Sequence, residues 1–162
     1  MTPPPKIAIF AGSFDPITLG HTEIALRGLK VFDKIVVALG INSQKKYLFS
    51  LEQRLEMLQK TFENEPNIEI ISYEELTVSL AKKMGANYIL RGLRSAADLE
   101  YEQPIALINS HLAPEIETVC LLSNPHTGHI SSTIVRELIK YGGNLEGLVP
   151  KAVMEVIGRN KA

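Results

Sequence analysis

A stretch at residues 12–21, Gly-Ser-Phe-Asp-Pro-Ile-Thr-Leu-Gly-His, has the residue types of a phosphate-binding turn. It follows an apolar run at residues 7–10 that is typical of a buried strand, and it leads into Ile24 and Gly28 at helix spacing. A small-residue turn between a strand and a helix presents backbone N–H groups and the positive end of a helix dipole to an anion. His21 lies on the first helical turn, where its ring can donate a hydrogen bond to a phosphoryl oxygen as charge builds there.

Neither of the two common glycine-rich phosphate motifs is present in the sequence. The stretch lacks the Gly-x-Gly-x-x-Gly pattern of dinucleotide-binding folds and the Gly-Lys-Ser/Thr ending of a Walker loop. The absence of this glycine pattern weakens the interpretation of the protein as a nicotinamide-dependent dehydrogenase. A histidine that merely packs on the helix is the alternative for His21. The turn and the Gly-His pair occur as a unit, however, and this unit resembles the (T/S)xGH signature of the nucleotidyltransferase superfamily, a resemblance that favours nucleotidyl transfer.

A polar loop at residues 42–49 carries two lysines between a predicted strand and a predicted helix. We expect Lys45 to contact an anion and Lys46 to be a solvated surface lysine. The helix that follows is predicted to begin with a capping box formed by Ser50 and Gln53.

The segment Arg91-Gly92-Leu93-Arg94 is predicted to leave the carboxyl end of a buried strand at residues 87–90. Guanidinium groups match phosphate oxygens bidentately, so a turn of this composition indicates a phosphate clamp. The alternative is that the arginines pair with the nearby acids at positions 98, 100 and 102. Both can hold at once, if the acids fix arginines that face a ligand.

Three consecutive hydroxyl side chains, Ser131, Ser132 and Thr133, occur where a late helix is predicted to begin. Capping needs only one of them, Ser131 or Ser132. The three together would add hydrogen-bond donors for a triphosphate beside the positive end of the helix dipole.

Strand and helix patterns alternate along the whole chain and predict an α/β fold. The expected strands cover residues 7–10, 34–40, 68–71, 87–90 and 118–122, and helices of ordinary length separate them. Pro104 should kink or split the helix after the fourth strand. Such alternation predicts a doubly wound, five-stranded parallel sheet with right-handed connections. Ligands then collect beyond the carboxyl ends of the strands, where His21, Lys45, Arg91 and Ser131 should share one rim.

The composition fits one globular domain over residues 1–162, with residues 1–5 as a short extended lead-in rich in proline. A net charge of −1 gives no reason to expect nucleic acid as a partner. Cys120 is the only cysteine, so neither a disulfide framework nor a cysteine metal site is expected. The sequence contains no apolar targeting segment and no membrane-length apolar run, so the cytoplasm is the expected location.

The motifs together resemble a known family. The stretch at 12–21 resembles the (T/S)xGH signature of the nucleotidyltransferase superfamily. Together with the Lys-Lys loop and the sequence Ile-Ser-Ser-Thr-x-Val-Arg-Glu from position 130, it is similar to bacterial adenylyltransferases. The Arg-Gly-Leu-Arg block is followed by acids at 98, 100 and 102, Tyr101 and Asn109. This block is similar to the phosphopantetheine adenylyltransferases and is not typical of the nicotinate-mononucleotide enzymes.

The resemblance implies a Rossmann-like nucleotidyltransferase fold and transfer of AMP from ATP to 4'-phosphopantetheine. It implies catalytic roles for His21, Lys45 and Arg91. Substrate-binding residues would be Ser13, Lys45, Thr77 and Arg91. ATP-binding residues would be Ser13, Phe14, His21, Gly92, Leu93, Arg94, Glu102, Thr127, Gly128, His129, Ile130, Ser131, Ser132 and Thr133.

The resemblance also implies Mg²⁺ bound to ATP with no protein metal site, a homohexamer, and feedback by coenzyme A. The sequence departs from the family pattern at Ala11, where proline is common, and at Thr77, where an apolar residue is common. Thr127 and His129 lie in a loop that often carries an aromatic residue, and we do not expect His129 to be catalytic. The alternatives are a nicotinate-mononucleotide adenylyltransferase and a nucleotide-sensing module without turnover.

Overall fold

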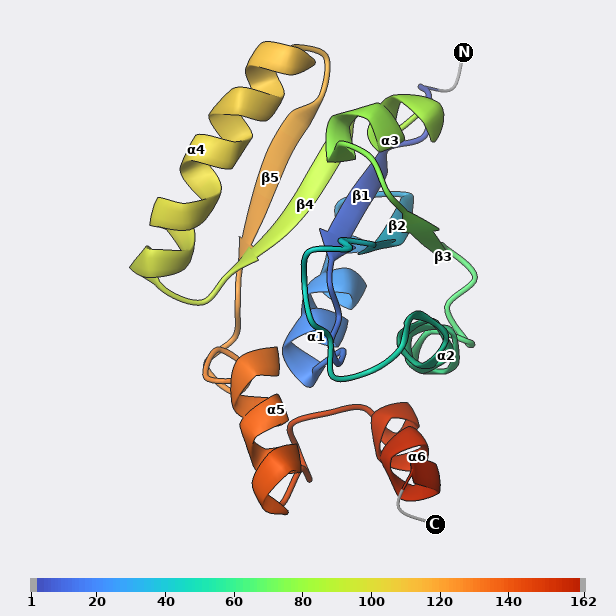
Figure 1. Cartoon of the computed structure of the whole chain (residues 1–162). Coiled ribbons are helices and arrows are strands. Elements are labelled where there is room, and N and C mark those ends of the chain that lie inside the picture. The colour runs from blue at the N-terminus through green and yellow to red at the C-terminus, as the bar shows by residue number, and fades with distance from the viewer. Residues whose placement is uncertain (1–2, 161–162) are drawn as a thin grey trace.

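The computed structural model describes residues 3–160, and its centre is a five-stranded parallel sheet (Figure 1). The strands lie in the order β3-β2-β1-β4-β5, and every neighbouring pair is parallel. The predicted doubly wound α/β fold is confirmed. Residues 3–5 of the expected lead-in are exposed and irregular, whereas residues 1 and 2 lie outside the described part. The strands are β1 (Ile7–Gly12), β2 (Lys34–Gly40), β3 (Ile68–Tyr73), β4 (Tyr88–Leu93) and β5 (Glu117–Leu122).

The helices begin and end where local signals place them. Ser50 and Gln53 form the predicted capping box of α2, and Ser131 caps α5 through a hydrogen bond from the Ile134 N–H. Gly142 ends α5 with φ of 71°, a conformation that glycine adopts without steric cost. The helices are α1 (Leu19–Gly28), α2 (Leu51–Thr61), α3 (Thr77–Lys83), α4 (Ala96–Leu112), α5 (Ser132–Tyr141) and α6 (Lys151–Asn160).

The sheet is buried on both faces, which explains why its central strands are continuously apolar. On β2, Ile35 and Val37 belong to the core beneath α1, α2 and the C-terminal helices. Val36 and Ala38 point to the opposite face and pack with Val78 of α3. Helices therefore cover both faces, as a doubly wound sheet requires.

Two local predictions need correction. The segment 91–93 is not a turn: it completes β4 and pairs with β5 as far as Leu93–Leu122, because the parallel ladder continues past the expected strand end. Of the two outcomes predicted for Pro104, a kink or a split, the split is wrong, since α4 runs unbroken over residues 96–112. Pro104 and Glu100 are both exposed, so water can satisfy the Glu100 carbonyl that loses its i+4 donor. None of the helices within residues 3–160 has the length and apolarity needed to cross a membrane.

The order of the strands reverses between β1 and β4. β1 pairs with β2 along its whole length, but its ladder with β4 holds only the pairs Ala8–Tyr88 and Ile9–Ile89. Beyond these pairs the carboxyl ends of β1 and β4 are free of one another, at the position where doubly wound sheets bind ligands. In Figure 1, α5 lies past this end of the sheet.

Candidate active site

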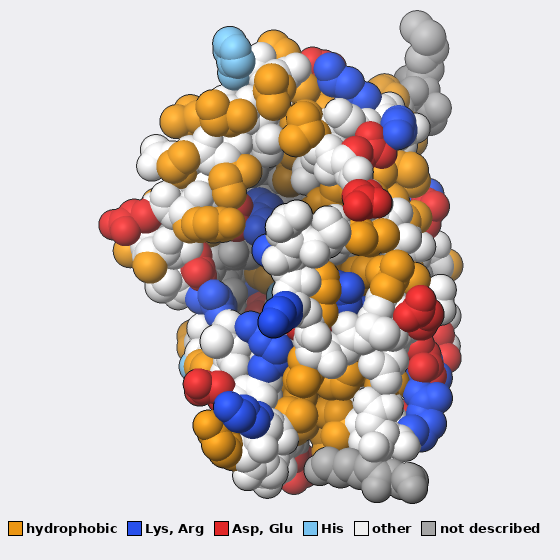
Figure 2. Space-filling view, viewed as in Figure 1, with side chains coloured by type: hydrophobic (Ala, Val, Ile, Leu, Met, Phe, Trp, Pro, Cys, Tyr) orange, Lys and Arg blue, Asp and Glu red, His pale blue; other side chains and the backbone are white. Residues whose placement is uncertain are grey.

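Two cavities lie at this reversal, one on each side of Arg91. The α3 cavity, of about 360 Å³, reaches from the ends of β1 and β2 to α3 and α4 and includes Lys45 and Thr77. The α5 cavity, of about 370 Å³, lies between the turn after β1, the start of α1 and α5, and includes His21. Figure 2 shows basic side chains around the hollow beside α4. Both cavities share Ala11, Gly12, Ser13, Arg91, Tyr101 and Glu102.

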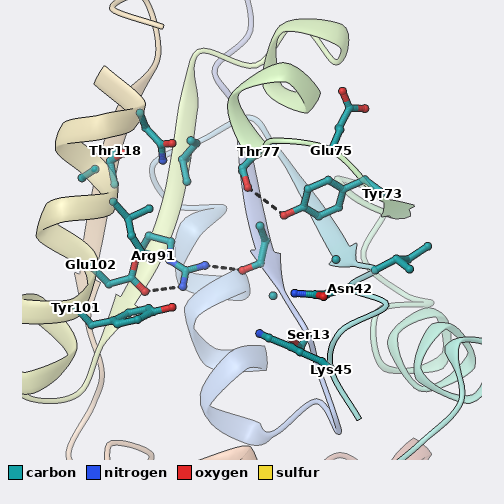
Figure 3. A pocket seen from close by; sticks show the side chains of 18 of the residues that line it. Ser13, Asn42, Lys45, Tyr73, Glu75, Thr77, Arg91, Tyr101, Glu102 and Thr118 are labelled. Carbon is teal, nitrogen blue, oxygen red and sulfur yellow. Dashed lines mark hydrogen bonds and ion pairs between the residues drawn. The ribbon is translucent and has the colours of Figure 1, made fainter. Parts of the chain in front are cut away.

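Arg91 is fixed between the two cavities by partners on α4 and β1. Its Nε donates to Glu102 at 2.9 Å, and its Nη2 donates to the second oxygen of the same carboxylate. Its Nη1 donates to the Ala11 carbonyl at 2.6 Å, beyond the point where the β1–β4 ladder stops (Figure 3). Arg91 therefore pairs with an acid and also lines both cavities, so the two roles considered for it from the sequence are compatible. Glu102, predicted to bind ATP, is buried and has both oxygens on Arg91.

His21 is oriented by the first turn of α1. The Thr18 backbone N–H donates to His21 Nδ1 at 3.1 Å, and Thr18 Oγ1 caps the His21 N–H in return. Because Nδ1 accepts from a backbone N–H, a neutral ring must carry its proton on Nε2. Burial, followed by the charges of Arg94 and Arg91, lowers the pKa of His21 to about 4. At neutral pH the ring is therefore an uncharged donor in the α5 cavity.

The turn after β1 is held under strain. Phe14 has φ of 44°, a left-handed conformation that a bulky side chain rarely adopts. Its ring is buried and contacts the His21 ring edge-on, with 5.1 Å between centroids. Downstream, Arg136 donates to the Asp15 carbonyl at 2.8 Å and Ser132 donates to the Pro16 carbonyl at 2.8 Å. α5 therefore helps to keep the turn in this conformation.

The predicted hydroxyl residues 131–133 and Arg94 line the α5 cavity, and each of these side chains already makes hydrogen bonds within the protein. Ser131 caps α5, Ser132 bonds the turn, and Thr133 accepts from Arg136 at 3.1 Å. Arg94 pairs with Asp98 and also donates to the Ile130 carbonyl at 3.2 Å. The hydrogen bonds from Arg94 lower the pKa of the Asp98 carboxyl, so it stays charged and holds the arginine. These groups are preorganised without a ligand.

Gly92 has a packing role as well as a place in the α5 cavity. A Cβ at this position would lie 2.9 Å from Ile24 Cγ1 of α1. A side chain here would push α1 away from β4, and His21 would move with it. Gly92, which the resemblance implied to be an ATP-binding residue, is thus also needed for the close approach of α1 to β4.

Lys45 has a different kind of support. It is exposed on the loop after β2, and in Figure 3 its side chain extends toward Ser13 in the α3 cavity. The loop is held further along, where Leu48 and Phe49 donate backbone N–H bonds of 2.8 and 2.9 Å to the Asp15 carboxylate. At the far wall, the Thr77 hydroxyl lies 3.0 Å from the Tyr73 hydroxyl.

The loop at 123–130 is fastened to α1 by an acid that the sequence analysis did not single out. Glu23 accepts from the Thr127 hydroxyl, from the Asn124 N–H at 3.4 Å and from Arg27 at 2.6 Å. Partial burial alone would raise the pKa of Glu23, but the hydrogen bonds from Thr127, Arg27 and Asn124 outweigh it and lower the pKa. Thr127 thus faces the protein.

Four of the predicted ATP-binding residues do not line either cavity. Leu93 is buried in β4 and His129 is exposed. The other two are Thr127 and Gly128. The remaining predicted site residues, from five separated segments, meet at the two cavities: Ser13, Phe14, His21, Lys45, Thr77, Arg91, Gly92, Arg94, Glu102, Ile130, Ser131, Ser132 and Thr133.

Comparisons with known proteins define first a class and then a family. The family model described as cytidylyltransferase-like matches residues 9–138, which contain β1 to β5 almost entirely and both cavities. A solved structure described as a nicotinate-nucleotide adenylyltransferase from Vibrio parahaemolyticus superposes with a TM-score of 0.75. It covers 96% of this chain and 93% of that chain at 18% identity, which shows a shared fold.

Closer relatives carry one name. The phosphopantetheine adenylyltransferase of Flavobacterium johnsoniae is 55% identical over 146 residues, covering 90% of this chain and 95% of the relative. The phosphopantetheine adenylyltransferase of Clostridium botulinum is 44% identical over 157 residues, covering 96% and 99%. The chain belongs to the phosphopantetheine adenylyltransferase family, and the resemblance stated from its motifs is confirmed.

Proposed function

We propose that this protein transfers AMP from ATP to 4'-phosphopantetheine, giving dephospho-coenzyme A and pyrophosphate. The observation that carries the proposal is the pair of cavities that meet at Ser13 and Arg91. One contains a helix start and a neutral histidine, and the other contains an exposed lysine. Two substrates bound on the two sides would bring an acceptor phosphate and an α-phosphorus together at Arg91. Family membership supports the same reaction.

In this proposal ATP occupies the α5 cavity. Its phosphates would lie at the start of α1 and beside Arg94 and the hydroxyls at 131–133, where N–H groups and helix dipoles favour anions. Phosphopantetheine occupies the α3 cavity, with its phosphate near Lys45 and Arg91 and its arm along Thr77. The acceptor phosphate attacks the α-phosphorus in line, and pyrophosphate leaves without a covalent enzyme intermediate.

The protein's part in this reaction is to position the reactants and to stabilise charge. The His21 Nε2–H would donate to an α-phosphoryl oxygen as negative charge builds on it. Lys45 and Arg91 would hold the attacking phosphate and offset its charge.

Magnesium is expected to arrive as part of the ATP complex. The acids that line the cavities are already engaged: Asp15 with backbone N–H groups, and Glu75, Asp98 and Glu102 with Lys83, Arg94 and Arg91. Among residues 3–160, His, Cys, Asp and Glu side chains form no group of three or more suited to a metal ion. Triphosphate oxygens and water would therefore supply most ligands of the ion.

A homo-oligomer, by resemblance a hexamer, is also proposed. α4 buries only Glu102 among its side chains, and hydrophobic side chains gather over it in Figure 2. Such a face is typical of an interface between subunits. The mass measured by analytical ultracentrifugation tests the assembly. We also propose feedback by coenzyme A, which is tested by measuring inhibition of the enzyme by coenzyme A. The proposed biosynthetic role implies a cytoplasmic location. The exposed apolar residues of α4 are Leu99, Tyr101, Ile105, Leu107, Ile108 and Leu112.

The deciding experiment is pyrophosphate release from magnesium-ATP with phosphopantetheine, with nicotinate mononucleotide and with no acceptor. We expect release only with phosphopantetheine, together with formation of dephospho-coenzyme A. Release only with nicotinate mononucleotide would keep the fold and mechanism but overturn the acceptor. ATP binding without release in any arm would make the protein a nucleotide sensor.

A further inference from the structure

Arg54 of α2 is a buried cation that has no acid partner among residues 3–160. Its exposed fraction is 2%, and its Nε has no hydrogen-bond partner. Its Nη1 donates to the Ser13 carbonyl at 2.9 Å. Burying a guanidinium without a carboxylate is costly, so a side chain kept in this state needs a reason other than ion pairing.

The second partner of Arg54 is an aromatic ring on the lysine loop. The guanidinium carbon lies 3.8 Å from the centroid of the Tyr47 ring, a cation–π contact. The Tyr47 hydroxyl is itself buried without a hydrogen-bond partner, so the ring face is the part of Tyr47 that is used. Arg54 therefore joins two segments, the turn after β1 and the loop that carries Lys45.

The turn held by Arg54 is the strained one. The Ser13 carbonyl and the Phe14 N–H belong to one peptide unit, and Phe14 is the residue with φ of 44°. A cation on the carbonyl keeps this peptide oriented and polarises its N–H, which makes the N–H a better donor to an anion. The Phe14 ring in turn contacts His21, 5.1 Å between centroids.

We propose that Arg54 is a positioning residue for adenylyl transfer: it fixes the strained Ser13–Phe14 peptide against His21 and the Tyr47 loop against that peptide, so that His21 and Lys45 face one crevice. Its charge, which forms no ion pair within residues 3–160, adds to the field that attracts the phosphates. The inference rests on the proposed function for its kinetic consequence, while its structural consequence can be tested without turnover.

The test compares Arg54→Met with wild type and with Arg159→Met, a control that removes an exposed arginine of α6 paired with Glu56 of α2. Displacement of reacting groups by about 1 Å costs on the order of 100-fold in rate. We expect kcat of Arg54→Met to fall about 100-fold with KM for ATP changing less than about threefold. Arg159→Met should keep the wild-type kcat.

Amide hydrogen exchange supplies the readout that does not depend on turnover. In Arg54→Met, exchange should quicken at residues 12–16 and 45–49 and stay unchanged in α6. A folded Arg54→Met with a wild-type kcat, or one whose exchange quickens evenly across α2 and α6, would overturn the proposal. If wild type lacked turnover but Arg54→Met showed the local exchange pattern, the proposed function would fail while the positioning contact stood.

Two further variants keep the test open if Arg54→Met does not fold. Arg54→Lys retains a charge but cannot both stack on Tyr47 and bond Ser13 with a planar fork, so kcat should recover only in part. Tyr47→Leu leaves Arg54 in place and should lower kcat about tenfold, with quicker exchange confined to residues 45–49. A wild-type kcat in both variants would contradict the proposal.

Discussion

The α5 and α3 cavities share a wall but are built differently. In the α5 cavity several polar side chains are already held by other groups of the protein: His21 by Thr18, Arg94 by Asp98, and Ser132 by the Pro16 carbonyl. In the α3 cavity Lys45 is exposed, and its ammonium has no ion-pair partner among residues 3–160, although its loop is fixed to the rest of the protein at Tyr47, Leu48 and Phe49. One half is largely preorganised, and the other contains an exposed lysine side chain that a ligand would have to order.

The difference matches what each half is asked to do in the proposed reaction. Charge builds on the α-phosphoryl group, and donors that stabilise it act best when they need no rearrangement. An acceptor phosphate must enter and leave, and ordering an exposed lysine on binding costs some affinity. Variants of the α5 cavity should therefore affect kcat most, and variants of the α3 cavity should affect KM for the acceptor.

His21→Ala is the strongest test of the preorganised half. Loss of the fixed Nε2–H donor should lower kcat about 1,000-fold, because the bond strengthens as charge builds in the transition state. ATP affinity, measured by calorimetry, should change less than about threefold. His129→Ala, at an exposed position in the neighbouring loop, is the matched control and should behave as wild type. Equal losses of kcat and ATP affinity would contradict this role.

Arg91→Met tests the wall that the two cavities share. It should lower kcat/KM about 100-fold for each of the two substrates, because Arg91 lines both cavities. It should also lower the free energy of unfolding by about 2 kcal/mol, because Glu102 is left buried without its partner.

The Arg91→Met/Glu102→Gln double variant separates these two effects. Removing the unpaired charge should restore stability in urea unfolding but leave activity low. Recovery of activity together with stability would show that Arg91 acts only as a structural partner of Glu102.

Lys45→Met tests the α3 cavity. Loss of one exposed ammonium should raise KM for phosphopantetheine about 30-fold and leave KM for ATP within about threefold. The effect should shrink at high salt, because the lysine is exposed to screening. Lys46→Met, the neighbouring exposed lysine, is the control and should behave as wild type. A larger effect on ATP than on the acceptor would reverse the assignment of the cavities.

The sequence predicted well what depends on local signals. Ser50 and Gln53 contain the α2 capping box within four consecutive positions, and apolar runs marked the central strands. Ligands bind at the carboxyl ends of parallel strands, and this rule predicted that His21, Lys45 and Arg91, from three separate segments, would lie at the same edge of the sheet. The boundary of β4 was wrong because its last residues depend on pairing with β5, which is not a local property.

The supporting contacts could not be predicted, since they join segments far apart in the chain. Helix spacing puts Arg54 on the apolar side of α2, between Leu51 and Leu58, but it cannot show that the side chain is buried against Ser13 and Tyr47. Glu23 likewise reads as a surface acid of α1, and only the fold brings Thr127 to it. Residue types at the site were informative, whereas the groups that hold them are visible only in three dimensions.

Glu23→Gln tests whether the loop at 123–130 belongs to the preorganised half. The amide keeps the size of the side chain but weakens its bonds to Thr127 and Arg27, so the loop should loosen. We expect KM for ATP to rise about fivefold with little change in KM for phosphopantetheine. Glu137→Gln, at an exposed acid of α5, is the control. An equal rise in both KM values would show that this loop does not contribute specifically to ATP binding.

The smallest expected effect concerns the protonation of His21. Its pKa is about 4 in the folded protein, below the usual 6.5, so between these values the unfolded chain binds a proton that the folded protein does not. Stability is therefore lost as the pH falls from about 6.5 toward 4. His21→Gln should remove this loss.

We therefore compare the free energy of unfolding of His21→Gln with that of wild type at two pH values. The variant's value minus the wild-type value should be about 1 kcal/mol larger at pH 5 than at pH 7. This figure is lower than the full pKa shift would give, because the ring is partly exposed. Titrating carboxylates are common to both proteins and cancel in the difference. Urea unfolding at the two pH values measures it. If the difference between the two proteins stays constant, His21 is not held neutral by the folded site, and the α5 cavity is less preorganised than its hydrogen bonds imply.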